Sequence, residues 1–173
     1  MSVVVILDSD FLSAFLKIEQ MPLIRSLYQV ETVAAPPAVY REVALTSLLA
    51  SLTALTWVKV VAPSVTQLEA LATDESFRRL GAGEQEAIAL AIAQKPTVLL
   101  GNDNQARRVA TKLGVDVVNI PAFLLACKQA RLVDRQTLAA LIADLRAKDF
   151  RVYPTWREIM WQQDADTAAT GTA

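Results

Sequence analysis

Residues 81–105 read GAGEQEAIALAIAQKPTVLLGNDNQ, and this stretch decides the fold class. An alanine-rich segment, residues 84–94, predicts a helix with acidic side chains in its first turn, where the helix dipole stabilises them. A Lys-Pro pair ends that helix, and the apolar run at 97–100 predicts a short buried strand. Asp103 follows soon after the strand. A helix that leads into a buried strand with an acid at its end is typical of a parallel α/β sheet.

Short apolar strands and helical segments alternate over the rest of the chain. Strands are expected at residues 3–7, 32–35, 57–61, 97–100 and 115–118. Helices are expected at residues 10–18, 23–28, 38–55, 64–74, 84–94, 105–113, 121–131 and 135–148, with a last amphipathic one from Pro154. This order predicts an α/β fold, a three-layer α/β/α sandwich with a central parallel sheet. The length of 173 residues suits a single domain, placed at 1–163, and the small polar residues of 164–173 predict a disordered tail.

Acidic residues lie where an apolar run stops or a helix begins: Asp8, Glu42, Glu86 and Asp103. Ligands of parallel α/β sheets bind outside the carboxyl ends of the strands, so Asp8 and Asp103 can meet although they are far apart in the chain. Several carboxylates repel one another in a small site, and a divalent cation removes that conflict. Oxygen ligands of this kind favour Mg²⁺ or Mn²⁺. The sequence therefore predicts an acidic metal site.

The composition excludes several kinds of chemistry. The chain has no histidine, which removes histidine-based nucleophile activation, histidine metal ligation and metal-free ribonuclease chemistry that depends on histidine. The single Cys127 cannot form an intrachain disulfide and fits a reducing cytoplasm, the expected location. The apolar run at 3–7 is too short for a membrane span and lacks the basic leader of a signal peptide. Because the net charge is −1, any attraction to phosphate must be local.

Four landmarks together resemble those of PIN-domain ribonucleases. The stretch 81–91 has the pattern G-x-G-E-x-E-A-I-A-L-A, with which the corresponding helix opens in VapC-like toxins of type II toxin–antitoxin systems. The other landmarks follow the order of that family: Asp8 after the first strand, the segment Pro36-Pro37-Ala38-Val39-Tyr40-Arg41-Glu42-Val43, and Asp103 ahead of an Ala-Arg-Arg-Val-Ala stretch. The resemblance covers residues 3–160, and its specificity comes from four motifs in the right order.

This resemblance implies a metal-dependent endoribonuclease that hydrolyses single-stranded RNA to products with 5′-phosphate and 3′-hydroxyl ends. The resemblance implies that four acids are both catalytic and metal-binding: Asp8, Glu42, Glu86 and Asp103. Glu84 is an adjacent candidate. The implied cofactor is Mg²⁺ or Mn²⁺. The implied partners are RNA, an antitoxin protein and a second copy of the chain in a homodimer, with no membrane.

Two further sets of residues are candidates for contacts with partners. Basic side chains that follow Asp103 on its helix are candidates for RNA binding: Arg107, Arg108 and Lys112. The chain is 53% hydrophobic, more than a core of this size needs, which predicts an apolar interaction surface. The expected contributors to that surface are Phe11, Phe15, Leu27, Phe123, Leu124 and Leu125.

Two other interpretations remain open from the sequence. Asp10 stands where the family usually has Ser or Thr, and Asn102 where many members have Asp, so the chain is alternatively a PIN-like binding module that no longer cuts. The pair Asp8 and Asp10 after a first apolar strand also resembles the nucleophile and acid of haloacid-dehalogenase-like phosphatases. No Ser/Thr or Lys stands at a convincing place for that second alternative.

Overall fold

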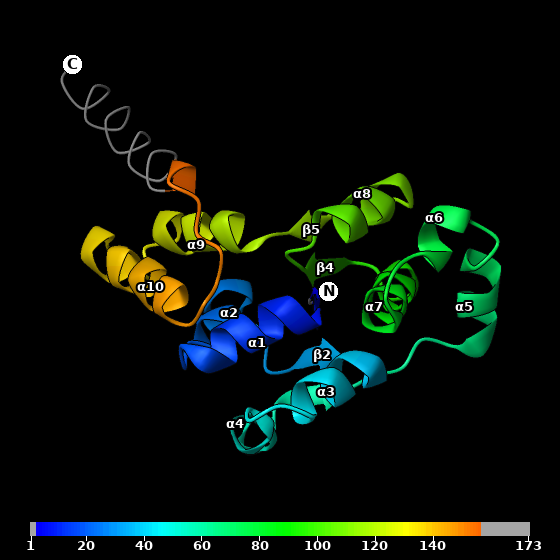
Figure 1. Cartoon of the computed structure of the whole chain (residues 1–173), viewed down its shortest axis with the longest axis horizontal. Coiled ribbons are helices and arrows are strands. Elements are labelled where there is room, and N and C mark those ends of the chain that lie inside the picture. The colour runs from blue at the N-terminus through cyan, green and yellow to red at the C-terminus, as the bar shows by residue number, and fades with distance from the viewer. Residues whose placement is uncertain (1–2, 157–173) are drawn as a thin grey trace.

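A parallel sheet forms the centre of the protein, and helices cover both of its faces (Figure 1). The computed structural model describes residues 3–156. Within them the sheet has five strands: β1 (Val4–Leu7), β2 (Val33–Ala35), β3 (Val58–Val60), β4 (Thr97–Leu100) and β5 (Val117–Val118). All the strand pairs are parallel, and the order across the sheet is β3-β2-β1-β4-β5. The predicted three-layer α/β/α sandwich is confirmed.

Side chains alternate between the two faces along each strand, because successive residues of a strand point to opposite sides. On β1, Val5 and Leu7 belong to one apolar cluster, whereas Ile6 belongs to the other. All three have at most 1% of their surface exposed. A strand that is buried on both faces reads as a continuous apolar run, which is why residues 3–7 lack the alternation of a half-exposed strand.

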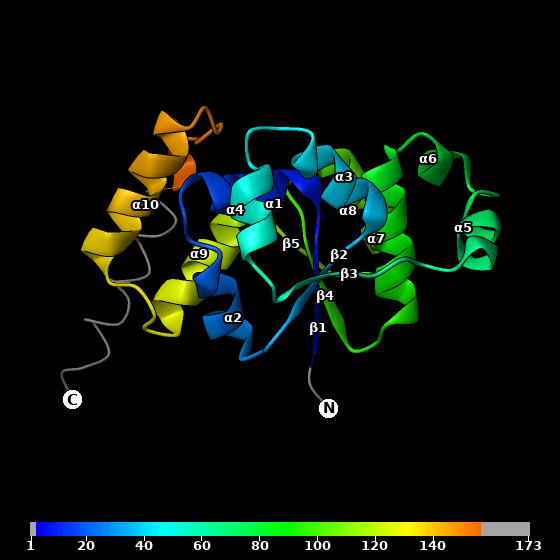
Figure 2. The ribbon, with the colours of Figure 1, turned by 90° about the horizontal axis from the view of Figure 1, so that it is seen from below.

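The helices divide into two layers, which Figure 2 shows on either side of the strands. The larger cluster holds buried side chains of α1 (Ser9–Lys17), α2 (Pro22–Tyr28), α3 (Pro37–Ala44), α4 (Leu49–Ala54), α9 (Ile120–Gln129) and α10 (Arg135–Ala147). The smaller one is formed by α5 (Val65–Leu71), α6 (Glu75–Arg78), α7 (Ala82–Ala93) and α8 (Asn104–Lys112). Helix α3 also packs against α7, so it joins the two layers at one edge of the sheet.

The long helix expected at 38–55 is two helices, since α3 ends at Ala44 and α4 begins at Leu49. Thr46 accounts for the break. Its hydroxyl donates to the carbonyl of Val43 (2.7 Å) and accepts from the backbone N–H of Leu48 (3.2 Å), so it competes with the helical hydrogen bonds. The helix expected from Pro154 falls largely outside the described residues, as does the tail at 164–173.

Within the described part of the chain, no helix has the length and hydropathy needed to cross a bilayer.

The three aromatic side chains expected on an interaction surface lie in the core instead. Phe11 stacks on Phe15 with ring centroids 4.7 Å apart, and Phe123 packs edge-on against both. All three are fully buried, as is Leu124, and Leu27 and Leu125 are partly buried against the same cluster. The prediction that these residues form an exposed apolar surface is wrong. Helix α9 folds back onto α1 and α2 and covers their apolar sides.

Replacing Phe123 with Ala should lower the free energy of unfolding by about 3–5 kcal/mol, because it leaves a cavity beside the stacked rings of Phe11 and Phe15. Urea denaturation measures the loss. The control is Leu45→Ala, because Leu45 is 83% exposed and its removal should change stability by less than about 0.5 kcal/mol. Equal effects of the two substitutions would contradict the placement of α9 in the core.

Candidate active site

The strand order creates a crevice between β1 and β4. The chain leaves β1 toward α1 on one face of the sheet and leaves β4 toward α8 on the other. Ligands of doubly wound sheets bind where connections diverge in this way, outside the carboxyl ends of the strands. The backbone N–H of Asp8 donates to the carbonyl of Leu100 (3.0 Å), so the ends of the two strands are in direct contact. The expectation that Asp8 and Asp103 lie at the same edge of the sheet is confirmed.

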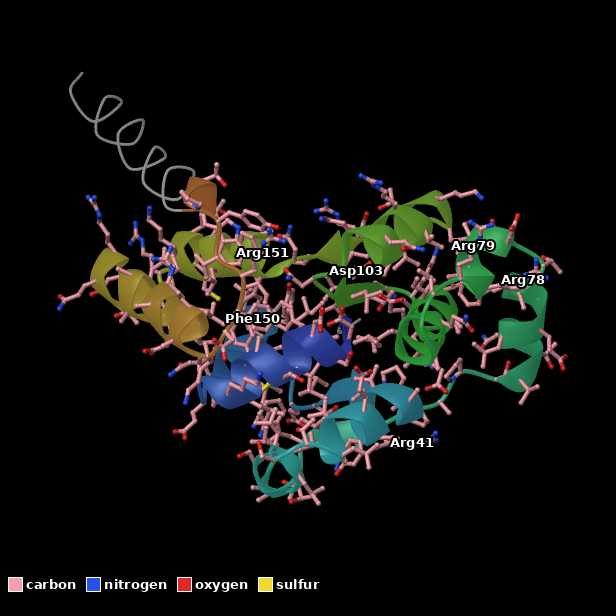
Figure 3. The ribbon with its side chains drawn as sticks, viewed as in Figure 1. Arg41, Arg78, Arg79, Asp103, Phe150 and Arg151 are labelled. Carbon is pink, nitrogen blue, oxygen red and sulfur yellow. The ribbon has the colours of Figure 1, made fainter. Side chains whose placement is uncertain are left out.

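A pocket of about 540 Å³ opens at this edge, between the first turns of α1 and α7, one side of α3 and the loop before α8. Among the described residues, five acids line it: Asp8, Asp10, Glu42, Glu84 and Asp103. The one basic side chain in that lining is Arg41, beside Glu42 on α3. Figure 3 shows Asp103 at the start of α8 and Arg41 on α3, on opposite sides of the opening. The pocket is therefore strongly acidic.

Asp8 forms the floor of the pocket and is 8% exposed. One carboxylate oxygen accepts from the backbone N–H of Phe11 (2.7 Å), which caps α1, and the other accepts from the backbone N–H of Asn102 (3.2 Å). Burial raises the pKa of Asp8 to about 7 against the effect of these two donors, and the negative charges of Asp10 and Glu84 raise it further. A fixed, buried carboxylate with a pKa near neutrality is a common property of functional sites.

Gly101 allows Asp8 to occupy this position. A Cβ atom on Gly101 would lie 2.7 Å from the Oδ2 atom of Asp8, which is closer than real contacts allow. The glycine between β4 and Asp103 is therefore required by the close approach of the backbone to the carboxylate. This role of Gly101 is not visible in the sequence, since it depends on a contact between residues far apart in the chain.

The other acids of the pocket also affect one another. Partial burial raises the pKa of Asp10, and the carboxylates of Glu42 and Asp103 raise it further. The pKa of Glu84 is raised by burial and by Asp103, Asp10 and Glu42, although the N–H of Gly81 opposes this shift. Their charges therefore repel one another across the pocket, and a bound cation would relieve that repulsion.

Glu86 differs from the other three acids of the predicted set, because the lining of the pocket includes them but not Glu86. Its carboxylate accepts from the backbone N–H of Ala38 (2.7 Å) in the first turn of α3, and it does not line the pocket. Glu84 is the acid of α7 that lines the pocket. Two residues along a helix turn by about 200°, so Glu84 and Glu86 cannot both face the same side. The resemblance favoured Glu86 and gave Glu84 only as an adjacent candidate, because the sequence does not report how α7 is rotated against the sheet.

Glu86 and Gly83 together hold α3 against α7. A Cβ on Gly83 would lie 3.1 Å from the side chain of Val39, so the glycine permits close contact between the helices. The bond from Ala38 to Glu86 fixes the first turn of α3 relative to α7. Glu42 lies one turn further along α3, and its position relative to Glu84 consequently depends on Glu86.

The donor set fits a hard divalent cation, although the acids are not arranged around one point. Mg²⁺ and Mn²⁺ prefer carboxylate oxygens, and such oxygens from several elements face this pocket. Within residues 3–156, however, no three acidic side chains lie close enough together to hold an ion as they stand. The expectation that four of them converge at metal-sharing distance is not met. Glu42 and Asp103 are exposed, so their side chains have room to rotate toward a bound ion.

The predicted RNA-binding residues have different surroundings. Arg107 is half-buried, lines a small hollow beside Asp103, and donates to the side chain of Asn104 (3.1 Å). Arg108 is exposed and has no hydrogen bond or ion pair with another described side chain. Lys112 donates to a carboxylate oxygen of Asp74 (2.7 Å), so it is engaged within the protein.

Comparison with known proteins agrees with this fold. Residues 4–164 match the sequence family described as a PIN domain. The chain belongs to the PIN-domain family. That membership gives it a nuclease-type fold and disfavours the phosphatase interpretation of Asp8 and Asp10. No curated protein matches the chain.

The raised pKa of Asp8 predicts how stability depends on pH in metal-free buffer. Between about pH 4 and pH 7 the folded state keeps a proton on Asp8 that the unfolded state has lost, so stability falls as the pH rises through this range. A pKa that moves from 3.8 to about 7 sets an upper limit of about 4 kcal/mol. Urea denaturation at several pH values measures the change.

Asp8→Asn should remove most of this loss, so that the variant is more stable than the parent at pH 8. Asn also caps helices, so α1 keeps its N-cap. Asp134→Asn is the matched control, because Asp134 is an exposed N-cap whose pKa is lowered by the N–H of Thr137. An Asp8→Asn variant with the pH dependence of the parent would contradict the burial of Asp8.

Proposed function

We propose that this protein is a divalent-metal-dependent endoribonuclease that hydrolyses phosphodiester bonds of single-stranded RNA. The observation that carries the proposal is the pocket between β1 and β4, where carboxylates from four parts of a PIN fold face one opening. Their mutual repulsion leaves the site poised to bind a cation. The chain also lacks histidine, so a nuclease with this sequence depends on another means of activating water.

The ligands that we assign are Asp8, Glu42, Glu84 and Asp103, and Glu86 is a positioning residue rather than a ligand. Asp8 is held rigidly by two backbone N–H groups, and the others reach the pocket from α3, α7 and the loop before α8. When bound, Mg²⁺ or Mn²⁺ lowers the pKa of a water molecule and neutralises charge on the phosphate. The protein's part is to hold these oxygens in place and to keep α3 and α7 at a fixed separation through Glu86.

Substitutions on α7 separate a ligand from a positioning residue. Glu84→Gln should reduce Mn²⁺-dependent cleavage of single-stranded RNA by about 10²-fold or more, because a ligand charge is removed. Glu86→Gln should retain most activity, because the amide oxygen of Gln still accepts from Ala38. Glu86→Ala should lose both activity and stability. Gel analysis of a labelled oligonucleotide and thermal unfolding provide the two readouts.

Controls decide whether Glu84 or Glu86 is the ligand on α7. If Glu86→Gln is inactive and Glu84→Gln is active, Glu86 is the ligand and our assignment is wrong. Activity of the parent protein that persists in excess EDTA would contradict metal dependence. Asp134→Asn serves as the control for removal of an acid far from the pocket, and it should cleave like the parent.

A PIN-like binding module that no longer cuts is the second candidate function. Asp10 adds an acid to the pocket, and Asn102 supplies no carboxylate beside Asp8, where its contribution is a backbone N–H. Tight Mn²⁺ binding without cleavage of any single-stranded RNA would favour this alternative.

We further propose a toxin role, with a small antitoxin protein as partner, on the resemblance of 81–91 to VapC-like toxins. A short neighbouring reading frame with an N-terminal DNA-binding pattern would support that role. The homodimer is also a prediction that rests on this resemblance. Its interface is not identified, because most of the side chains first expected to form it lie in the core. Light scattering of the purified chain at micromolar concentration tests it.

A further inference from the structure

Basic side chains gather on two helices beside the acidic pocket. Of the seventeen Lys and Arg residues in the chain, five lie on α6, at its C-cap or on α8: Arg78, Arg79, Arg107, Arg108 and Lys112. These two helices are neighbours, and Figure 3 shows Arg79 at the end of α6 that lies toward α8, with Arg78 on the other side of α6. A chain with a net charge of −1 thus presents a locally positive surface on one side of its acidic site.

A groove of about 330 Å³ runs between α6 and α8. Its walls carry two guanidinium groups together with a hydroxyl, an amide, an acid and an apolar side chain: Arg79, Arg108, Ser76, Gln105, Glu75 and Val109. Arg79 comes from one helix and Arg108 from the other. The guanidinium, hydroxyl and amide groups can all donate hydrogen bonds to phosphate oxygens, whereas the carboxylate of Glu75 cannot. The groove therefore has the donor chemistry of an anion site.

The two walls are fixed to each other by Asp74. Its carboxylate accepts from the backbone N–H of Ser76 (2.8 Å), which caps α6, and from the ammonium group of Lys112 on α8 (2.7 Å). These bonds lower the pKa of Asp74 well below its usual value, with the bond to Lys112 as the largest cause. Asp74 thus stays ionised at neutral pH and holds the walls of the groove together.

Within the groove the two arginines differ in what they already bind. Arg79 forms an ion pair with Glu75, one turn earlier on the same exposed surface. Arg108 forms no ion pair or hydrogen bond with another side chain in the described part of the chain. Arg108 is consequently free to bind an external anion, whereas Arg79 must exchange Glu75 for it.

Helix α8, together with its N-cap residue, contributes to both the acidic pocket and the groove. Asp103, which lines the pocket, is the N-cap of α8, and Arg107 lines the hollow next to it. Arg108 is the next residue and faces the groove on the side of α6. At a rise of 1.5 Å per residue, Arg108 lies about 7–8 Å along the helix axis from Asp103. A strand that crosses the pocket can therefore continue into the groove without leaving the protein surface.

We propose that the groove between α6 and α8 binds the phosphate backbone of the RNA on one side of the bond to be cleaved. This inference rests on the proposed function and adds a site to it. The acidic pocket repels phosphate, so the substrate needs a separate source of attraction close by. Arg108 and Arg79 supply that attraction, and the contact with phosphate is independent of sequence.

The experiment measures RNA binding without cleavage. Asp8→Asn protein is the background, and its dissociation constant for a labelled single-stranded oligonucleotide is measured by fluorescence anisotropy at several salt concentrations. Arg108→Gln should weaken binding about three- to tenfold, and the double variant Arg79→Gln/Arg108→Gln should weaken it further. The slope of log affinity against log salt concentration should fall by about 0.7 for each phosphate that the variant no longer neutralises. Glu75→Gln should strengthen binding, because it releases Arg79.

Arg146→Gln is the matched control, since Arg146 is an exposed arginine on α10, far from this groove, and should leave binding unchanged. Thermal unfolding of each variant checks that the fold is intact. If the parent cleaves RNA but the double variant binds like the control, the groove assignment is wrong and the proposed function stands. If the parent neither binds nor cleaves RNA, both proposals fail.

Discussion

Repulsion between carboxylates at the carboxyl edge of the sheet is the constraint on which the site depends. Asp8, at the centre of this edge, is buried, and its pKa is raised to about 7 mainly by that burial. Asp10 and Glu84 have raised pKa values for the same two reasons, burial and neighbouring negative charge. Selection for stability alone would disfavour a cluster of carboxylates that repel one another. Its presence is consistent with a site that uses the negative charge, and carboxylate oxygens from several residues are suitable ligands for a divalent cation.

The surrounding structure holds this unfavourable arrangement in place. Two backbone N–H groups bind the carboxylate of Asp8, and Gly101 leaves room for it. On the opposite side of the pocket, Glu86 bonds to the first turn of α3 and Gly83 lets that helix approach α7. Residues outside the pocket lining thus help to determine where the carboxylate oxygens of the pocket lie. The groove between α6 and α8 would then supply the attraction for phosphate that the acidic pocket cannot.

The sequence predicts the parts of the fold that depend on local pattern. Apolar runs of four or five residues identified β1 and β4, and these runs placed Asp8 and Asp103 at the ends of adjacent strands. The break at Thr46 depends on a side chain that competes with the backbone, which periodicity does not report. The burial of Phe123 depends on α9 folding back onto α1, so composition alone suggested a surface. Tertiary packing also decides whether Glu84 or Glu86 faces the pocket, because this depends on how α7 is rotated against the sheet.

Thermal unfolding as a function of Mn²⁺ concentration tests the central claim most directly. The measurement is made at pH 8. When the Mn²⁺ concentration is one hundred times the dissociation constant, binding to the folded state stabilises the protein by about 2.7 kcal/mol. This corresponds to a rise of roughly 5–10 °C in Tm. We expect this rise in the parent and in Glu86→Gln, and we expect it to be absent in Asp8→Asn and Glu84→Gln. A Tm that is insensitive to Mn²⁺, or that rises equally in all four proteins, would contradict a metal site built on Asp8 and Glu84.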